Sequence, residues 1–100
     1  MSVPRGRTPI VVFSTEALDD LKKIIEWGVN NGYGDPVAFA DDLIDTITTT
    51  LTTLRGGARK GRISGTYELV LSSSKHIAVL VETPAGFEVL RVLHGSMQFP

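Results

Sequence analysis

The run from Phe87 to Leu93 constrains the fold more than any other stretch, because apolar side chains fall on both of its faces. This pattern is typical of a strand that lies inside a sheet rather than at its edge. Two polar residues, Arg91 and His94, mark the end of the run before Gly95 interrupts it. Polar groups at the end of a buried strand are often held there for contact with another molecule. We therefore expect a central strand that ends at a functional surface.

Two helices are predicted upstream of this strand. Apolar residues at alternating spacings of three and four predict the first helix from Thr15 to about Asn30, with Ser14 or Thr15 as its N-cap. The pair Asp35-Pro36 is typical of a second helix start, and the same spacing continues to about Leu54. Two striped helices joined by a short turn form an antiparallel hairpin.

Four strands are predicted around these helices. A β-branched and aromatic run at Pro9–Phe13 gives the first strand. The other three are Thr66–Leu71, Ile77–Glu82 and Phe87–Leu93, and the short turns between them favour an antiparallel meander. The order β-α-α-β-β-β predicts an α+β fold in which the helical hairpin packs on one face of an antiparallel sheet.

Length, composition and charge narrow the function. The 100 residues suffice for one domain, and we expect residues 1–8 to form a flexible basic arm. The chain has no cysteine and two histidines, so we expect no metal and no cofactor. No apolar run approaches the roughly 20 residues that cross a bilayer, and no signal peptide is recognisable, so we expect a cytoplasmic protein without a membrane partner. The net charge of −1 argues against nucleic acid as the main partner.

Two interpretations remain open for each polar residue at the end of the last strand. Arg91 needs an anionic partner, which is either Glu68 on a neighbouring strand or a carboxylate of another protein. His94 is either a hydrogen-bonded structural group or an acid–base catalyst. His76 begins a strand after a serine-rich turn, and we expect its side chain to be exposed.

A glycine-rich basic loop follows the second helix. Its cationic residues are Arg55, Arg59, Lys60 and Arg62. They either complement the C-terminal end of the helix, a role that suits Arg55 best, or form a patch for an acidic partner.

Three segments resemble the ParE/RelE toxin superfamily of bacterial type II toxin–antitoxin systems, in particular its ParE and plasmid-stabilisation branch. They are S-T-E-A-L-D-D-L-K-K-I-I-E-W at Ser14–Trp27, G-R-I-S-G-T-Y-E-L-V at Gly61–Val70, and V-L-R-V-L-H-G with a short tail that ends in aromatic-Pro at residues 89–100. They occur in the family's order. The resemblance implies the same α+β fold, a growth-inhibiting toxin, and an antitoxin whose partly disordered tail folds over the toxin in a hetero-oligomer.

The resemblance leaves the cellular target open. RelE-like members cut messenger RNA in the ribosome, whereas ParE-like members inhibit DNA gyrase. RelE-like nucleases carry lysine and arginine on the central strands and a tyrosine near the tail. Here Glu68 stands among aliphatic residues on the first of those strands, and the tail has no tyrosine. The catalytic candidates are therefore reduced to Arg91, His94 and Arg62, which favours the ParE-like function over a messenger-RNA endonuclease.

This sequence also departs from the ParE branch. Tyr67 stands where arginine is usual, and Leu80-Val81 stands where Tyr-Arg is usual. An antitoxin-binding module with weak or lost toxicity is therefore a second alternative. Under all three functions we expect the partner-binding residues to be Arg55, Arg59, Lys60, Arg62, Arg91, His94 and Phe99.

Overall fold

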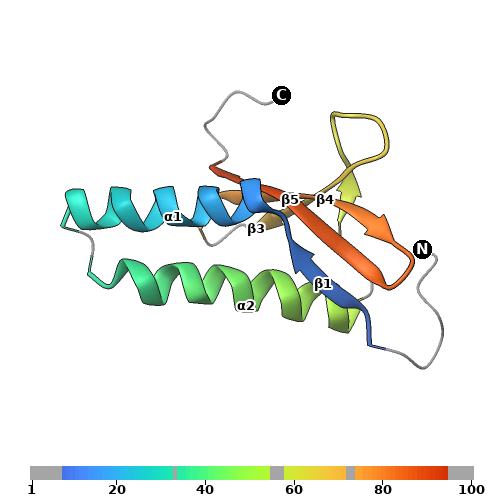
Figure 1. The fold of residues 1–100 in the computed structure, drawn as a ribbon, viewed down its shortest axis with the longest axis horizontal. Coiled ribbons are helices and arrows are strands. Elements are labelled where there is room, and N and C mark those ends of the chain that lie inside the picture. Colours follow the sequence, from blue (N-terminus) through green and yellow to red (C-terminus); the bar gives the residue numbers. More distant parts are fainter. Residues whose placement is uncertain (1–7, 33, 55–57, 72–73, 95–100) are drawn as a thin grey trace.

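The computed structural model describes residues 8–32, 34–54, 58–71 and 74–94. This part of the chain forms one strand, then two helices, then four strands (Figure 1). Their bounds are β1 Ile10–Phe13, α1 Thr15–Asn30, α2 Pro36–Leu54, β2 Arg59–Lys60, β3 Tyr67–Leu71, β4 His76–Thr83 and β5 Gly86–His94. The predicted basic arm and the tail after residue 94 lie outside the described residues.

The five strands form one sheet in the order β1-β5-β4-β3-β2. β5 lies between β1 and β4, which confirms the prediction of an interior strand. The α+β fold is confirmed, but the sheet is mixed rather than wholly antiparallel, because β1 pairs parallel with β5. β2 is a two-residue strand in a segment predicted as loop. Turn lengths predict pairing between strands that are neighbours in the sequence. The β1–β5 pair instead joins strands that are far apart in the sequence.

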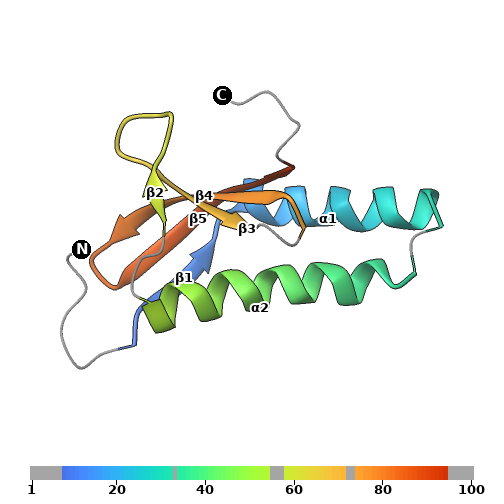
Figure 2. The same cartoon turned by 180° about the vertical axis from the view of Figure 1, so that it is seen from behind.

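The two helices form the predicted hairpin and cover one face of the sheet (Figure 2). Ser14 is the N-cap of α1, where its hydroxyl accepts a hydrogen bond from the backbone N–H of Ala17 at 3.1 Å. Asp35 does the same for α2 by accepting from Ala38 N–H at 3.1 Å. The core between the layers consists of Ala17, Leu21, Leu43, Ile47, Leu51, Leu69, Leu71, Ala78, Leu80, Phe87, Val89 and Val92.

A bulge in β5 divides its residues between the two faces of the sheet. Val79 pairs with Arg91, but the next residue, Leu80, pairs with Val89, so Leu90 is an extra residue in β5. Residues after the bulge therefore point to the face opposite to the one that simple alternation predicts. We call the face turned away from the helices the far face, and its residues on β3, β4 and β5 are Glu68, Val70, Ile77, Val79, Val81, Glu88, Arg91 and Leu93.

In the part of the chain that the structure describes, neither helix has the length and apolar character needed to span a bilayer.

Candidate functional site

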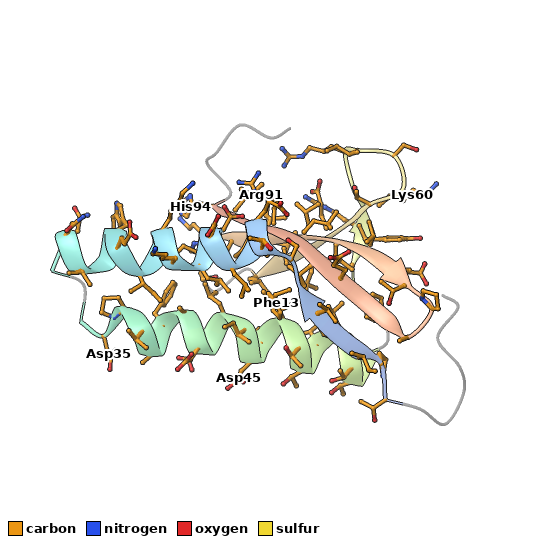
Figure 3. All side chains as sticks on the ribbon, viewed as in Figure 1. Phe13, Asp35, Asp45, Lys60, Arg91 and His94 are labelled. Carbon is orange, nitrogen blue, oxygen red and sulfur yellow. The ribbon has the colours of Figure 1, made fainter. Side chains whose placement is uncertain are left out.

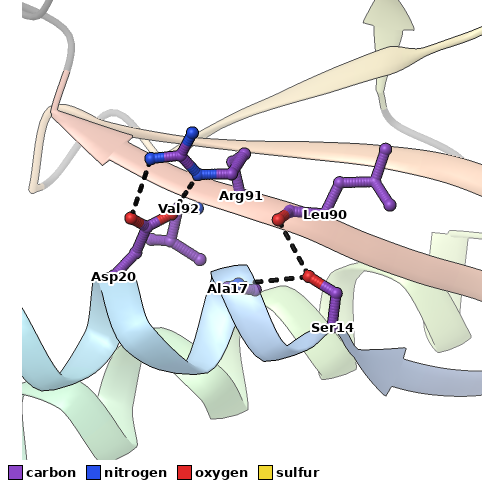
Figure 4. Close-up of polar contacts among 6 residues, drawn as sticks. All are labelled: Ser14, Ala17, Asp20, Leu90, Arg91 and Val92. Atoms are coloured by element: carbon purple, nitrogen blue, oxygen red, sulfur yellow. Dashed lines mark hydrogen bonds and ion pairs between the residues drawn. The ribbon is translucent and has the colours of Figure 1, made fainter.

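Arg91 forms an ion pair with Asp20 of α1 (Figure 4). Its Nε and Nη2 atoms donate to the two carboxylate oxygens of Asp20 at 2.7 and 3.0 Å. This bidentate geometry is the strongest arrangement open to an arginine and a carboxylate. These hydrogen bonds to Asp20 raise the pKa of Arg91 further above its ordinary value. The expected partner, Glu68, was therefore wrong: the partner lies on a helix and not on a neighbouring strand.

The same end of α1 closes the open edge of β5. β1 ends at Phe13, opposite Val89, so the following residues of β5 have no neighbouring strand on that side. Ser14 donates from its backbone N–H to Val89 O and from its hydroxyl to Leu90 O, both at 2.9 Å. Asp20 accepts from Val92 N–H at 2.9 Å. Helix side chains thus satisfy the backbone groups that an exposed strand edge would leave unpaired.

Glu68 is the second buried acid, and it holds two arginines. Its side chain is 2% exposed. Oε1 lies 3.4 Å from Arg59 Nη2, and Oε2 lies 3.6 Å from Arg62 Nε. The backbone N–H of Arg62 also donates to Oε2 at 3.0 Å. A carboxylate this deeply buried requires such compensation, because a lone charge is costly to remove from water.

One row of residues links these two ion pairs across the sheet. Arg59 is opposite Glu68, Glu68 is opposite Val79, and Val79 is opposite Arg91. Residues opposite each other on neighbouring strands share a face, so both arginines lie on the far face. At a strand spacing of about 4.8 Å, the Cα atoms of Arg59 and Arg91 are about 14 Å apart.

The two histidines lie on the helix face, where β4 begins and β5 ends. His76 is opposite His94, and the ring centroids are 5.3 Å apart. The His76 ring also meets Phe39 of α2 edge-on at 5.8 Å. His76 is 8% exposed, so the expectation of an exposed side chain was wrong. Burial, together with the nearby His94, lowers the pKa of His76 below its ordinary value.

The predicted site residues therefore do not converge. Arg91 lies on the far face, and His94, three positions further along the same strand, lies on the helix face. Figure 3 labels both residues. Arg62 lies at the opposite side of the sheet, beside Glu68. Lys60 is opposite Tyr67, which packs against the core on the helix face. Arg55 and Phe99 lie outside the described residues.

Asp20 is the site residue that sequence reasoning missed. The sequence does contain a sign that Asp20 is buried, because position 20 falls on the buried stripe of α1 that includes Ala17, Leu21 and Gly28. An acid at a buried helix position requires a partner, and Arg91 has the same requirement. Among the described residues, no group of three or more histidine, aspartate or glutamate side chains could hold a metal ion.

A family model and solved structures both match this chain. The family model described as "ParE toxin of type II toxin-antitoxin system, parDE" matches residues 11–99. A solved structure titled "Chromosomal ParDE TA system from P. aeruginosa" superposes with a TM-score of 0.74 at 17% identity. The match covers 87% of this chain and 96% of that chain, and at this identity it shows a shared fold. No curated protein sequence matches.

Proposed function

Because the chain belongs to the ParE toxin family of type II toxin–antitoxin systems, we propose that a cognate antitoxin neutralises it and that it arrests growth by binding DNA gyrase. It is a toxin that acts by occupying its target rather than by cutting a nucleic acid. The antitoxin and the toxin form a hetero-oligomer in which the toxin is inactive.

The separation of the candidate catalytic residues carries this proposal. Metal-free RNA cleavage needs a base, an acid and a cation grouped around one phosphate. Arg91 and His94 point to opposite faces of the sheet, and Arg62 lies about three strands away from Arg91. Arg91 and Arg62 are also paired with buried carboxylates, which would repel a phosphate placed beside them. This arrangement favours binding over phosphodiester chemistry.

An assay with purified gyrase tests the proposal directly. We expect the purified chain, added to gyrase and plasmid, to reduce supercoiling and to accumulate cleaved plasmid. Addition of the antitoxin should restore supercoiling. Normal supercoiling at a large molar excess of toxin would overturn the gyrase assignment.

A second assay distinguishes a gyrase inhibitor from a messenger-RNA endonuclease. Toeprinting on translating ribosomes should show no codon-specific cuts when the chain is added. Cuts that vanish in a His94→Ala variant would instead establish RNA cleavage, and this variant should fold because His94 is exposed. A positive result in either assay assigns the target, and negative results in both favour an antitoxin-binding module without toxicity.

The departures from the ParE branch keep the non-toxic binding module as a second candidate. Leu80 is fully buried in the core and Tyr67 packs against that core on the helix face. The departures at Tyr67 and Leu80 therefore alter packing, whereas the departure at Val81 alters the far face. Harmless overexpression of a chain that still binds its antitoxin tightly would favour the module. A neighbouring reading frame for a small acidic DNA-binding protein would identify that antitoxin.

A further inference from the structure

The segment from Arg59 to Leu71 forms a β2–β3 hairpin, and the loop between its two strands projects from the sheet on the side away from α2 (Figures 1 and 2). Its turn is held by its own hydrogen bonds. Gly61 N–H donates to Thr66 O at 2.8 Å, and the Thr66 hydroxyl and N–H donate to Ile63 O at 2.6 and 3.1 Å. A side chain at position 61 would collide with the Thr66 hydroxyl, so glycine allows this close approach. The hairpin is thus an ordered projection.

Buried Glu68 fixes the two arginines of this hairpin in place. The carboxylate is almost fully buried, yet the side chains of Arg59 and Arg62 are 62% and 45% exposed. The carboxylate therefore holds both arginines while part of each side chain remains exposed to solvent. Arg59 donates one hydrogen bond, to Glu68, and its other N–H groups have no partner among the described residues. Side chains ordered before binding lose less conformational entropy on binding.

Apolar side chains lie beside these cations. Val70 follows Glu68 by two residues on β3, so it shares the far face, and it is 46% exposed. Ile63, in the turn next to Arg62, is 41% exposed. Two partly exposed arginine side chains thus lie near two exposed aliphatic residues, Val70 on the same face and Ile63 next to Arg62 in the sequence.

The composition of this surface favours a polypeptide over a nucleic acid. Nucleic acids are held through many phosphate contacts and a broad basic field. Here one carboxylate lies between two arginines, Lys60 projects to the other face of β2, and the chain as a whole carries a net charge of −1. Arginine clusters with neighbouring apolar contacts are a recurring means of binding acidic peptide segments.

We propose that Arg59, Arg62, Ile63 and Val70 form a docking surface for a peptide segment in which acidic and aliphatic residues alternate. The carboxylates of the segment bind the solvent-exposed parts of the two arginine side chains, and its aliphatic side chains cover Ile63 and Val70. That this segment belongs to the antitoxin rests on the proposed function. The surface itself does not, because it is defined by the residues of the hairpin.

Peptide binding to the purified full chain tests this surface. The probe is a fluorescent peptide of alternating glutamate and leucine, and its affinity is measured by anisotropy for the wild type and for Arg59→Gln, Arg62→Gln and Lys60→Gln. Lys60 is among the residues that the sequence predicts to bind a partner, but it lies on the opposite face of β2. Lys60→Gln is therefore the matched control, because it removes the same charge from the same hairpin outside the proposed surface. We expect each arginine variant to weaken binding about tenfold, the effect of one charge-assisted hydrogen bond, and the control to change it less than about threefold.

Three further measurements exclude other causes of a loss in binding. A peptide with glutamine in place of glutamate should bind the wild type no better than the arginine variants bind the acidic peptide. Circular dichroism establishes that each variant is folded, and Arg59→Lys, which preserves the charge beside Glu68 but not the planar fork, should show an intermediate loss if Arg59→Gln unfolds.

Three results would overturn the proposal: equal losses for Lys60→Gln and the arginine variants, tighter binding of a DNA duplex than of the acidic peptide, or self-association through the exposed aspartates of α2 in place of peptide binding. A failed gyrase assay would leave these results unaffected, so the two proposals fail separately.

Discussion

Asp20 and Arg91, which are 71 residues apart in the sequence, form a bidentate ion pair that joins the first helix to the last strand of the sheet. The same carboxylate accepts a third hydrogen bond from the backbone N–H of Val92. One acid on α1 thus compensates both a guanidinium charge and a strand-edge amide. The position of β5 relative to the helices depends on this contact.

Removal of the negative charge at position 20 should destabilise the fold. Asp20→Asn preserves size but leaves Arg91 without its counter-ion, and we expect a loss of about 2 kcal/mol in the free energy of unfolding. This value is below that of a fully buried pair because the Arg91 side chain is 37% exposed. Urea denaturation measures it. Asp19→Asn, at an exposed neighbouring position, should change the free energy by less than about 0.5 kcal/mol, and equal losses would refute the special role of Asp20.

Ser14 has two separable roles, as the cap of α1 and as a donor to β5. Ser14→Ala removes both the hydrogen bond from Ala17 N–H and the one to Leu90 O. We expect a loss of about 1 to 2 kcal/mol in the free energy of unfolding. Thr15→Ala is the control at the next, exposed residue, where the loss should be small. Thermal denaturation of both variants measures these losses. A Ser14→Ala protein as stable as the wild type would show that neither hydrogen bond contributes to stability.

Gly86 allows β1 to approach β5. A Cβ atom at this position would overlap the carbonyl oxygen of Ile10 and lie 2.5 Å from Ile10 N. Gly86→Ala should therefore displace β1 and cost about 3 kcal/mol, the upper range for overpacking, because backbone atoms cannot rotate away. Gly34→Ala is the matched control, since nothing lies within 4 Å of a Cβ there. Equal denaturation midpoints for the two variants would contradict the close approach.

His76 should make stability fall on acidification. Its pKa in the folded protein is lowered from 6.5 by burial and by the neighbouring His94. The unfolded chain therefore takes up a proton more readily than the folded chain as the pH drops below about 6.5, and protonation favours unfolding. The loss continues until the pH passes the lowered pKa of the folded state.

A His76→Leu variant isolates this contribution. Leucine preserves apolar contact with Phe39 but does not titrate, so the variant should lose less free energy of unfolding than the wild type between pH of about 7 and about 5. Denaturant titrations at several pH values give both slopes. Identical slopes would show that His76 does not contribute to the pH dependence.

Local sequence patterns predicted the helices and the interior strand well. The bounds of α1, the cap at Ser14 and the Asp35-Pro36 start of α2 follow from spacing and capping preferences that act within a few residues. The central place of β5 follows from its apolar character on both faces. These features depend on neighbouring residues, so the sequence displays them directly.

The features that were not predicted arise from pairings between distant residues. Simple alternation along β5 places Arg91 on the same face as Phe87 and Val89, but the extra residue at Leu90 moves it to the far face. Period-two patterns do not reveal a bulge, because a bulge depends on the register with the partner strand. The pairing of Arg91 with Asp20 and the burial of His76 beneath Phe39 depend on tertiary packing in the same way.

The pairing of β1 with β5 also affects how the protein is made. During synthesis, β1 and α1 leave the ribosome before β5 exists, and within the described residues β1 pairs with β5. Such long-range contacts form slowly, and unpaired strands are exposed in the meantime. The nascent chain therefore cannot complete its sheet until β5 has been translated, so the folded toxin forms only after that delay.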